Sequence, residues 1–319
     1  MREAVVVYCK GFAMGAADVV PGVSGGTIAL IVGIYDRLIR ALTAIGPRAL
    51  APARRLHRSD GRAALRDELV GMDAPFLLAL GLGMVTAVVV LANAMHVATT
   101  RYPVPTYAFF FGLIAASAIV LYGEVDVRTP RRIGVALAGV VIAALVTGAT
   151  ATGAAHGPLI VFVSGAIAIC AMVLPGVSGA FLLLVLGQYE YMTGVLSDFT
   201  GALVATLNGE SLQPVIEPGT VVAVFLAGAV VGLFTMAHAI RYALDRYRAA
   251  TMTFLVSLMV GALRLPVERV DGSLGETAAN SLAAAVVAGV VGAAIVLLVD
   301  RYTDDLSYAA EPAESRAEE

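Results

Sequence analysis

Two copies of the motif Pro-Gly-Val-Ser-Gly carry the residues of this sequence that are best suited to binding chemistry. Each copy interrupts an apolar stretch. A helix that restarts after such a break presents unpaired N–H groups and the positive end of its dipole, which can hold a phosphate or a carboxylate, and serine hydroxyls add further donors. The predicted binding residues are Pro21, Gly22, Ser24, Gly25, Gly26, Thr27, Pro175, Gly176, Ser178 and Gly179. The alternative is that the Pro-Gly pairs only shape a structural turn.

One acid, Asp18, lies three residues before Pro21 in the first apolar stretch. A carboxylate inside a membrane segment is a functional candidate by default, here as a proton relay or as the partner of a cation. Its alternative role is that of a strut within a hairpin. Lys10, two helical turns earlier, either pairs with Asp18 or extends to the cytoplasmic surface, and we favour the second role.

The other polar residues are weaker candidates. Asp36 and Glu190 occupy equivalent positions after the two motifs, where helix capping or loop solvation is the favoured role. Asn93, His96 and His238 either line a cavity or make hydrogen bonds between helices. Four arginines have suitable chemistry for a phosphate: Arg37, Arg40, Arg241 and Arg264. The tendency of arginine to lie on the cytoplasmic side explains the first three equally well.

The composition indicates what kind of element must position these residues. The chain has 319 residues, of which 59% are hydrophobic and 14% are charged, and its mean hydropathy is +0.86. These values are typical of a polytopic membrane protein rather than of a soluble domain. A net charge of −3 gives no indication of nucleic-acid binding. The two cysteines fit no disulfide or metal spacing, and we expect no cofactor and no metal.

Six segments are long enough to cross the membrane, because a spanning helix needs roughly 20 apolar residues. They are approximately 75–97, 104–122, 131–152, 218–240, 250–267 and 279–299. The stretches 4–36 and 158–194 are apolar too, but the motif breaks each of them centrally. We therefore predict two hairpins that dip into the membrane, and backbone broken at that depth must be enclosed by protein or face a wet cavity.

The chain is an internal duplication. A constant offset of 154 residues aligns the two motifs and also Gly33 with Gly187 and Asp36 with Glu190, without a gap. Repeat 1 is residues 1–152, with the hairpin, a cytoplasmic loop at 37–74 and three helices. Repeat 2 is residues 153–303, with its hairpin, an external loop at 197–217 and three helices. Residues 304–319 form an acidic tail that we expect to be disordered.

Arginine distribution predicts the orientation. The loop after the first hairpin holds eight arginines between residues 37 and 66, so it should be cytoplasmic, whereas the loop 197–217 has no basic residue and should be external. Each half then contributes an odd number of crossings, so the second half is inverted. The predicted fold is an all-α inverted repeat in the plasma membrane, and in such transporters broken helices meet near the midplane.

The sequence around both motifs resembles a known family. The stretches Gly15–Ile39 and Cys170–Met192 are similar to the paired signatures of the DUF368 membrane family. This resemblance implies a polyprenyl-phosphate translocase that returns the lipid carrier of surface-glycan synthesis to the cytoplasmic face. It also implies a lipid-phosphate partner and no nucleotide site, and it leaves homo-oligomerisation open.

Two other functions remain as alternatives. Polyprenyl-pyrophosphate phosphatases share inverted repeats and a related Pro-Gly-x-Ser-Arg-Ser motif, but Gly25 and Gly179 stand where their arginine would be. Without that charge and without paired glutamates in the membrane, hydrolysis would lack a cation to bind the pyrophosphate and a general base. We therefore predict that the protein is not an enzyme. A transporter of small anions is the stronger rival, because backbone N–H groups bind phosphate with or without an attached lipid.

Overall fold

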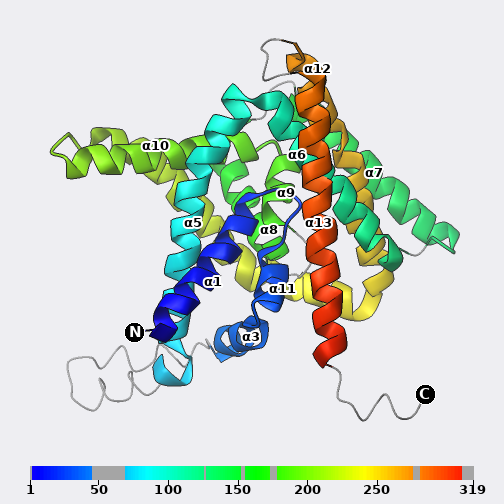
Figure 1. The fold of residues 1–319 in the computed structure, drawn as a ribbon, viewed down its shortest axis with the longest axis horizontal. Helices are drawn as coiled ribbons and strands as arrows, with labels where there is room; N and C mark the ends of the chain where they lie inside the picture. Colours follow the sequence, from blue (N-terminus) through cyan, green and yellow to red (C-terminus); the bar gives the residue numbers. More distant parts are fainter. Residues whose placement is uncertain are drawn as a thin grey trace.

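The computed structural model describes residues 2–44, 69–125, 127–151, 155–172, 178–275 and 281–310, and every regular element in these ranges is helical. The elements are α1 (Arg2–Val19), α2 (Gly25–Ile31), α3 (Tyr35–Ala44), α5 (Ala74–Arg101), α6 (Pro103–Val120), η2 (Leu121–Glu124), α7 (Pro130–Ala151), α8 (Pro158–Met172), α9 (Gly179–Val185), α10 (Tyr189–Leu207), α11 (Gln213–Ala262), α12 (Arg264–Ser273) and α13 (Leu282–Ala310). The start of α1 and the end of α13 lie at the end of the molecule opposite to α12 (Figure 1).

Within the described ranges, six helical segments are long and apolar enough to cross a membrane, as predicted. They are Ala74–Arg101, Pro103–Gly123, Pro130–Gly148, Gln213–Leu233, Arg246–Ser273 and Leu282–Arg301. The fourth span lies in α11, and the fifth runs from the second part of α11 into α12. Non-helical backbone at Tyr247 marks a kink between the two parts of α11. The all-α polytopic class is therefore confirmed.

The two hairpins have matching broken helices. The helices α2 and α9 are both seven residues long, and they begin at equivalent positions, Gly25 and Gly179. Each is followed by a glycine with a positive φ, Gly33 at 69° and Gly187 at 66°, which is a backbone conformation that other residues rarely adopt. After Gly187 the chain bends by 113° into α10. The structure thus places a sharp turn at the same point of each repeat.

Helix pairs in the two repeats also correspond. The helix α1 packs against α5 where a Cβ added to Gly11 would overlap the backbone of Leu80. The helix α8 packs against α11 where a Cβ on Gly165 would overlap Phe225, and Gly165 is the repeat equivalent of Gly11. Small residues let membrane helices approach closely, which provides the van der Waals contact that replaces the hydrophobic effect there.

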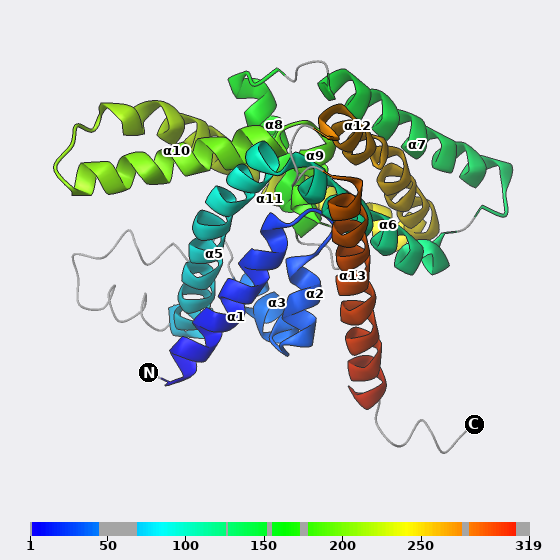
Figure 2. The same ribbon diagram turned by 45° about the horizontal axis from the view of Figure 1, so that its top comes forward.

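The remaining pairs join the repeats. The helix α6 packs against α13 through Gly112 and Gly289, and α7 packs against α11 through Gly139 and Ser257. In Figure 2 the upright helices α5 and α13 stand on either side of α1, α2 and α3. In each of these contacts a helix of repeat 1 packs against a helix of repeat 2. The contacts support the predicted inverted repeat, which stays a prediction.

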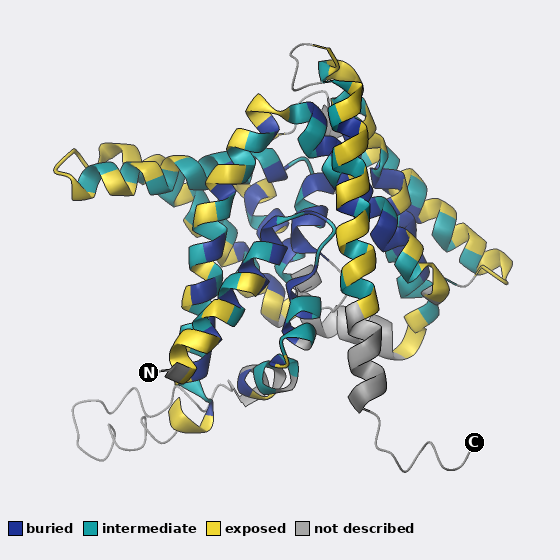
Figure 3. Cartoon of the chain, in the orientation of Figure 1, coloured by how far each residue is buried: buried dark blue, intermediate teal, exposed yellow. Residues whose placement is uncertain are grey.

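The main core surrounds the second broken helix. Buried side chains of α6 such as Phe110 and Leu113 pack on Phe181 and Leu184 of α9 and on Met259 of α11. The buried residues gather at the centre of the molecule, whereas the long helices are exposed toward their ends (Figure 3). The core thus encloses α9, the helix that follows the second motif.

Three predicted boundaries were wrong, because packing or helix continuity overrode loop-like composition. The loop predicted at 37–74 begins with α3, since Leu38 and Ala41 pack against the first hairpin. The loop predicted at 197–217 shrinks to 208–212, because the first strong turn signal is Asn208-Gly209 and a proline is tolerated in the first turn of α11. The tail expected from 304 is helical to Ala310, with no glycine or proline to end α13 earlier. Residues 311–319 lie outside the described part.

Candidate functional site

The first broken helix is capped by the carboxylate of Asp18. The backbone N–H of Gly25 donates a hydrogen bond to Asp18 Oδ1 at 3.0 Å, and both residues are buried. A Cβ on Gly25 would lie 2.5 Å from the carboxylate oxygens, so a larger residue there would force the carboxylate or the start of α2 to shift. The prediction that this N–H is free was therefore wrong, because an internal anion already occupies the end of α2.

Lys10 binds the other end of α2. Its Nζ donates to the carbonyl oxygen of Val32 at 2.5 Å. The structure thus gives Lys10 a role that differs from both predicted ones, since its bond is neither to Asp18 nor to the lipid surface. The last carbonyls of a helix have no intrahelical donor, and a cation there also complements the helix dipole.

Residues of both motifs line one pocket. Gly22 from the first motif and Ser178 from the second lie in its wall. The rest of the wall is apolar and consists of Leu121, Phe181, Leu182, Met252, Leu255 and Met259. The pocket therefore brings the two breaks together between α9 and the second half of α11.

The two motif serines differ in their hydrogen bonds. Ser178 caps α9, because its Oγ accepts from the N–H of Phe181 at 3.3 Å. The hydroxyl of Ser24 is buried and has no partner within the described residues. The carbonyl of Gly22 accepts from Ser117 Oγ of α6 at 2.9 Å. Ser24 is thus the motif side chain with unused hydrogen-bonding capacity.

The other predicted motif residues are only partly described. Pro21 and Gly26 are buried and Thr27 is half-buried, all within the first break. Gly179 is buried at the start of α9. Pro175, Gly176 and the side chain of His238 lie outside the described residues. Their predicted roles stay predictions.

Two of the arginine candidates, Arg37 and Arg264, have carboxylate partners. Arg37 donates to Asp73 through Nε at 2.5 Å and through a second nitrogen at 3.1 Å, and it also pairs with Glu3 at 2.9 Å. Arg264 pairs with Glu268 at 2.5 Å, one turn further along α12. Carboxylates of the protein thus already hold both guanidinium groups, and a role of either arginine in phosphate binding stays a prediction.

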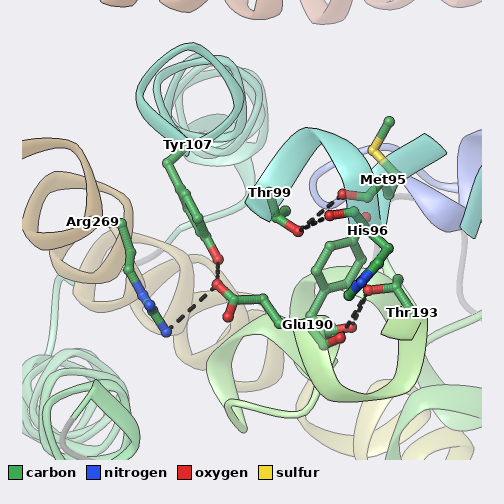
Figure 4. Close-up of polar contacts among 8 residues, drawn as sticks. Met95, His96, Thr99, Tyr107, Glu190, Thr193 and Arg269 are labelled. Atoms are coloured by element: carbon green, nitrogen blue, oxygen red, sulfur yellow. Dashed lines mark hydrogen bonds and ion pairs between the residues drawn. The ribbon is translucent and has the colours of Figure 1, made fainter. Parts of the chain in front are cut away.

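Sequence reasoning missed a cluster that joins three helices (Figure 4). Tyr107 of α6 donates a short hydrogen bond to Glu190 Oε1 of α10, and Arg269 of α12 lies 3.5 Å from the same oxygen. The guanidinium of Arg269 also lies over the Tyr107 ring, 5.8 Å from its centre. The alignment of Glu190 with Asp36 is the signal in the sequence that points to Glu190. Helix capping or loop solvation explains an acid at this position equally well. No spacing in the sequence connects Arg269 to either partner.

Neighbouring polar residues mainly hold helices together. Asn93 of α5 accepts from Ser197 of α10 at 3.0 Å, which favours the helix-packing role. His96 lies against Gly194 of α10, and its buried Nδ1 has no partner among the described residues. Across the described ranges no three His, Cys, Asp or Glu side chains are grouped as a metal site would require.

Comparisons with known proteins show the family of this chain. Residues 14–280 match the family described as undecaprenyl phosphate translocase-like. The chain belongs to this family. Its relatives include the polyprenyl-phosphate transporter of Vibrio cholerae serotype O1, which is 37% identical over 80% of this chain and 75% of the relative. Another is the polyprenyl-phosphate transporter of Staphylococcus aureus, which is 30% identical over 80% of this chain and 83% of the relative. No solved structure matches.

Family membership and the six apolar helices agree on the class of the protein. The undecaprenyl phosphate translocase-like chain described above is a multi-pass membrane protein. Its family and relatives are transporters rather than enzymes, as the missing arginine at Gly25 and Gly179 predicted. The resemblance of the two motif regions to a translocase family is thereby confirmed.

Proposed function

We propose that this protein returns a polyprenyl phosphate from the outer to the cytoplasmic face of the plasma membrane, for reuse in surface-glycan synthesis. Transport of a polyprenyl phosphate is the activity that the names of its relatives give. The direction and the cellular role go beyond those names. They rest on the chemistry of a carrier whose phosphate remains outside once its glycan has been transferred.

The observation that carries the proposal is the pocket between the two motifs. Its wall combines Gly22 and Ser178 with six apolar side chains. A hydrated small anion would need polar groups on most sides, because leaving an anion unpaired in an apolar wall is costly. The pocket has a volume of about 20 Å³ in this structure, so it must widen to admit substrate. An amphiphile would then satisfy both parts, with its phosphate at the motifs and its prenyl chain against leucine, methionine and phenylalanine.

The first motif supplies donors for the phosphate. The first N–H groups of α2 have no intrahelical acceptor, and the Ser24 hydroxyl is unpaired within the described residues. The Asp18 carboxylate competes for the same donors, since it holds the N–H of Gly25. A phosphate can approach only if Asp18 moves away or takes up a proton. This competition is the physical basis on which we propose Asp18 as a coupling residue.

The predicted inverted repeat suits a transport cycle of alternating access. Equivalent glycine contacts join α1 to α5 and α8 to α11, while α6 and α7 pack against helices of the other repeat. Rocking of one set against the other would expose the pocket first on one side and then on the other. The reciprocal contacts support this cycle.

A vesicle assay with purified protein tests the proposal. Polyprenyl phosphate is placed in one leaflet, and its appearance in the other is followed with and without inorganic phosphate as a competitor. We expect protein-dependent movement of the lipid that inorganic phosphate inhibits weakly. Uptake of inorganic phosphate without lipid movement would instead show a small-anion transporter. Release of phosphate from the pyrophosphate form would show a phosphatase.

A further inference from the structure

The oxygen Oε1 of Glu190 is the meeting point of two donors from different helices. The Tyr107 hydroxyl of α6 and the Arg269 guanidinium of α12 both point at it, as Figure 4 shows. A neutral donor and a cation that converge on one oxygen form a site for an anion, and in this structure the anion is a side chain of the protein itself.

Arg269 contributes only one long contact to the internal anion. Glu190 is the one ion-pair partner that the described residues give Arg269, through a single contact of 3.5 Å. Arg37, by contrast, makes two bonds to Asp73 and one to Glu3, all at 3.1 Å or less. The side chains of Arg269 and Glu190 are 43% and 39% exposed. A guanidinium with five N–H donors therefore retains capacity for an incoming anion.

The position of the cluster suits the collection of substrate. By the orientation predicted from the arginine-rich loop, α12 and the start of α6 lie at the outer face. Figure 1 places α12 at the end of the molecule away from the N-terminus and α3. A phosphate that waits on the outer surface would thus meet Arg269 before it reaches the motif pocket.

The cluster is also connected to the first break. Tyr189, the neighbour of Glu190, is buried, and its hydroxyl donates to the carbonyl oxygen of Val19 at 2.8 Å. The ring of Phe110 packs edge-on against both Tyr107 and Tyr189, with centres 5.7 and 5.6 Å apart. Displacement of Glu190 would therefore act on the turn of α10 that touches the end of α1.

We infer that Tyr107 and Arg269 form an outer docking site for the phosphate of the lipid, in which Glu190 is the exchangeable stand-in. Substrate phosphate replaces the Glu190 carboxylate on these two donors before it passes to the motif pocket. The inference rests on the proposed function, because it assumes that the arriving anion is a lipid phosphate. The docking site is separate from the motif pocket, because the pocket wall does not include Tyr107, Glu190 or Arg269.

Equilibrium binding of farnesyl phosphate to protein in detergent tests the inference. Glu190→Gln should bind farnesyl phosphate several-fold more tightly than the wild type, because the competing charge is gone while an amide oxygen can still accept from Tyr107. Arg269→Gln should bind about tenfold more weakly, since a charge-assisted bond is lost. Tyr107→Phe should also bind more weakly. The control Asp271→Asn removes the same charge from an exposed position of α12, and its affinity should stay at the wild-type value.

The outcomes separate the possibilities. A purely structural latch predicts no gain in affinity for Glu190→Gln, and that result would overturn the inference. If Asp271→Asn gains as much affinity as Glu190→Gln, the effect comes from net charge alone, and that result would also refute the site. A gain for inorganic phosphate but none for farnesyl phosphate would refute the lipid assignment. Wild-type protein that moves polyprenyl phosphate in vesicles while Glu190→Gln shows no gain would leave the proposed function intact.

Discussion

Lys10 and Asp18 lie eight residues apart on α1 and bind opposite ends of the short helix α2. Asp18 accepts from the N–H of Gly25 at the start of that helix, and Lys10 donates to the carbonyl of Val32 just after its end. The negative charge thus faces the positive end of the α2 dipole and the positive charge faces the negative end. A seven-residue helix is marginal by itself, so α1 must supply much of what keeps it helical.

Replacement of Lys10 should loosen this arrangement. In Lys10→Met the Val32 carbonyl loses its charged donor, and we expect a loss of about 1 kcal/mol in stability together with reduced lipid-phosphate flux. Thermal denaturation in detergent and the vesicle assay measure the two effects. Lys10→Arg keeps a cationic donor and should retain most of both. Unchanged stability in Lys10→Met would show that the contact contributes nothing.

Asp18→Asn tests the coupling role. The amide oxygen can still accept from the N–H of Gly25, so the hairpin should keep its fold, but an amide cannot cycle a proton. We expect lipid-phosphate flux that no longer responds to an imposed pH gradient across the vesicle membrane. A variant that responds as fully as the wild type would reduce Asp18 to a hairpin strut.

Gly25→Ala should impair transport through the same carboxylate. The added Cβ would lie 2.5 Å from the Asp18 oxygens, so the carboxylate or the start of α2 must shift. Gly81→Ala on α5 is the matched control, because nothing lies within 4 Å of its added Cβ. Gly139 would be a poor control, since its Cβ would meet Ser257 at 2.8 Å. Equal flux in both variants at equal expression would make the first motif a tolerant turn.

The ion pair between Arg37 and Asp73 predicts a dependence of stability on pH. Hydrogen bonds from Arg37 lower the pKa of Asp73 below its ordinary value of 3.8. The stabilisation is therefore complete above about pH 4 and is lost as the pH falls through the lowered pKa. Arg37→Gln should denature at a lower temperature than the wild type at pH 7, by a small amount because both side chains are partly exposed. A difference of the same size at pH 3 would contradict this account.

Labelling of single cysteines tests the predicted inversion of the repeats. Cysteines at Arg58 and Ser211, in a background without Cys9 and Cys170, should react with an impermeant reagent from opposite sides. Arg58 lies in the arginine-rich loop, outside the described residues, and Ser211 lies in the exposed turn between α10 and α11. Reaction of both from the same side would exclude an inverted repeat.

The sequence by itself determined the features that depend on local chemistry. About 20 apolar residues without a charge can only cross the bilayer as a helix, so the six spans were predictable. Pro-Gly pairs and the aligned glycines at 33 and 187 set the breaks, because the backbone conformation there is a property of these residues. The family could be recognised for the same reason, since its signatures are these breaks.

Only the tertiary structure decided which polar groups meet. Asp18 and Gly25 are near in sequence, yet their hydrogen bond depends on the direction in which α2 folds back along α1. Tyr107, Glu190 and Arg269 come from three helices, and no spacing reveals them as partners. The packing of α6 between α9 and α13 brings these three side chains together. This packing uses close contacts at glycines, and the periodicity of the sequence does not reveal which segment each glycine contacts. Local propensity fixes where a helix breaks, whereas the choice of neighbours is made by shape complementarity between segments far apart in the chain.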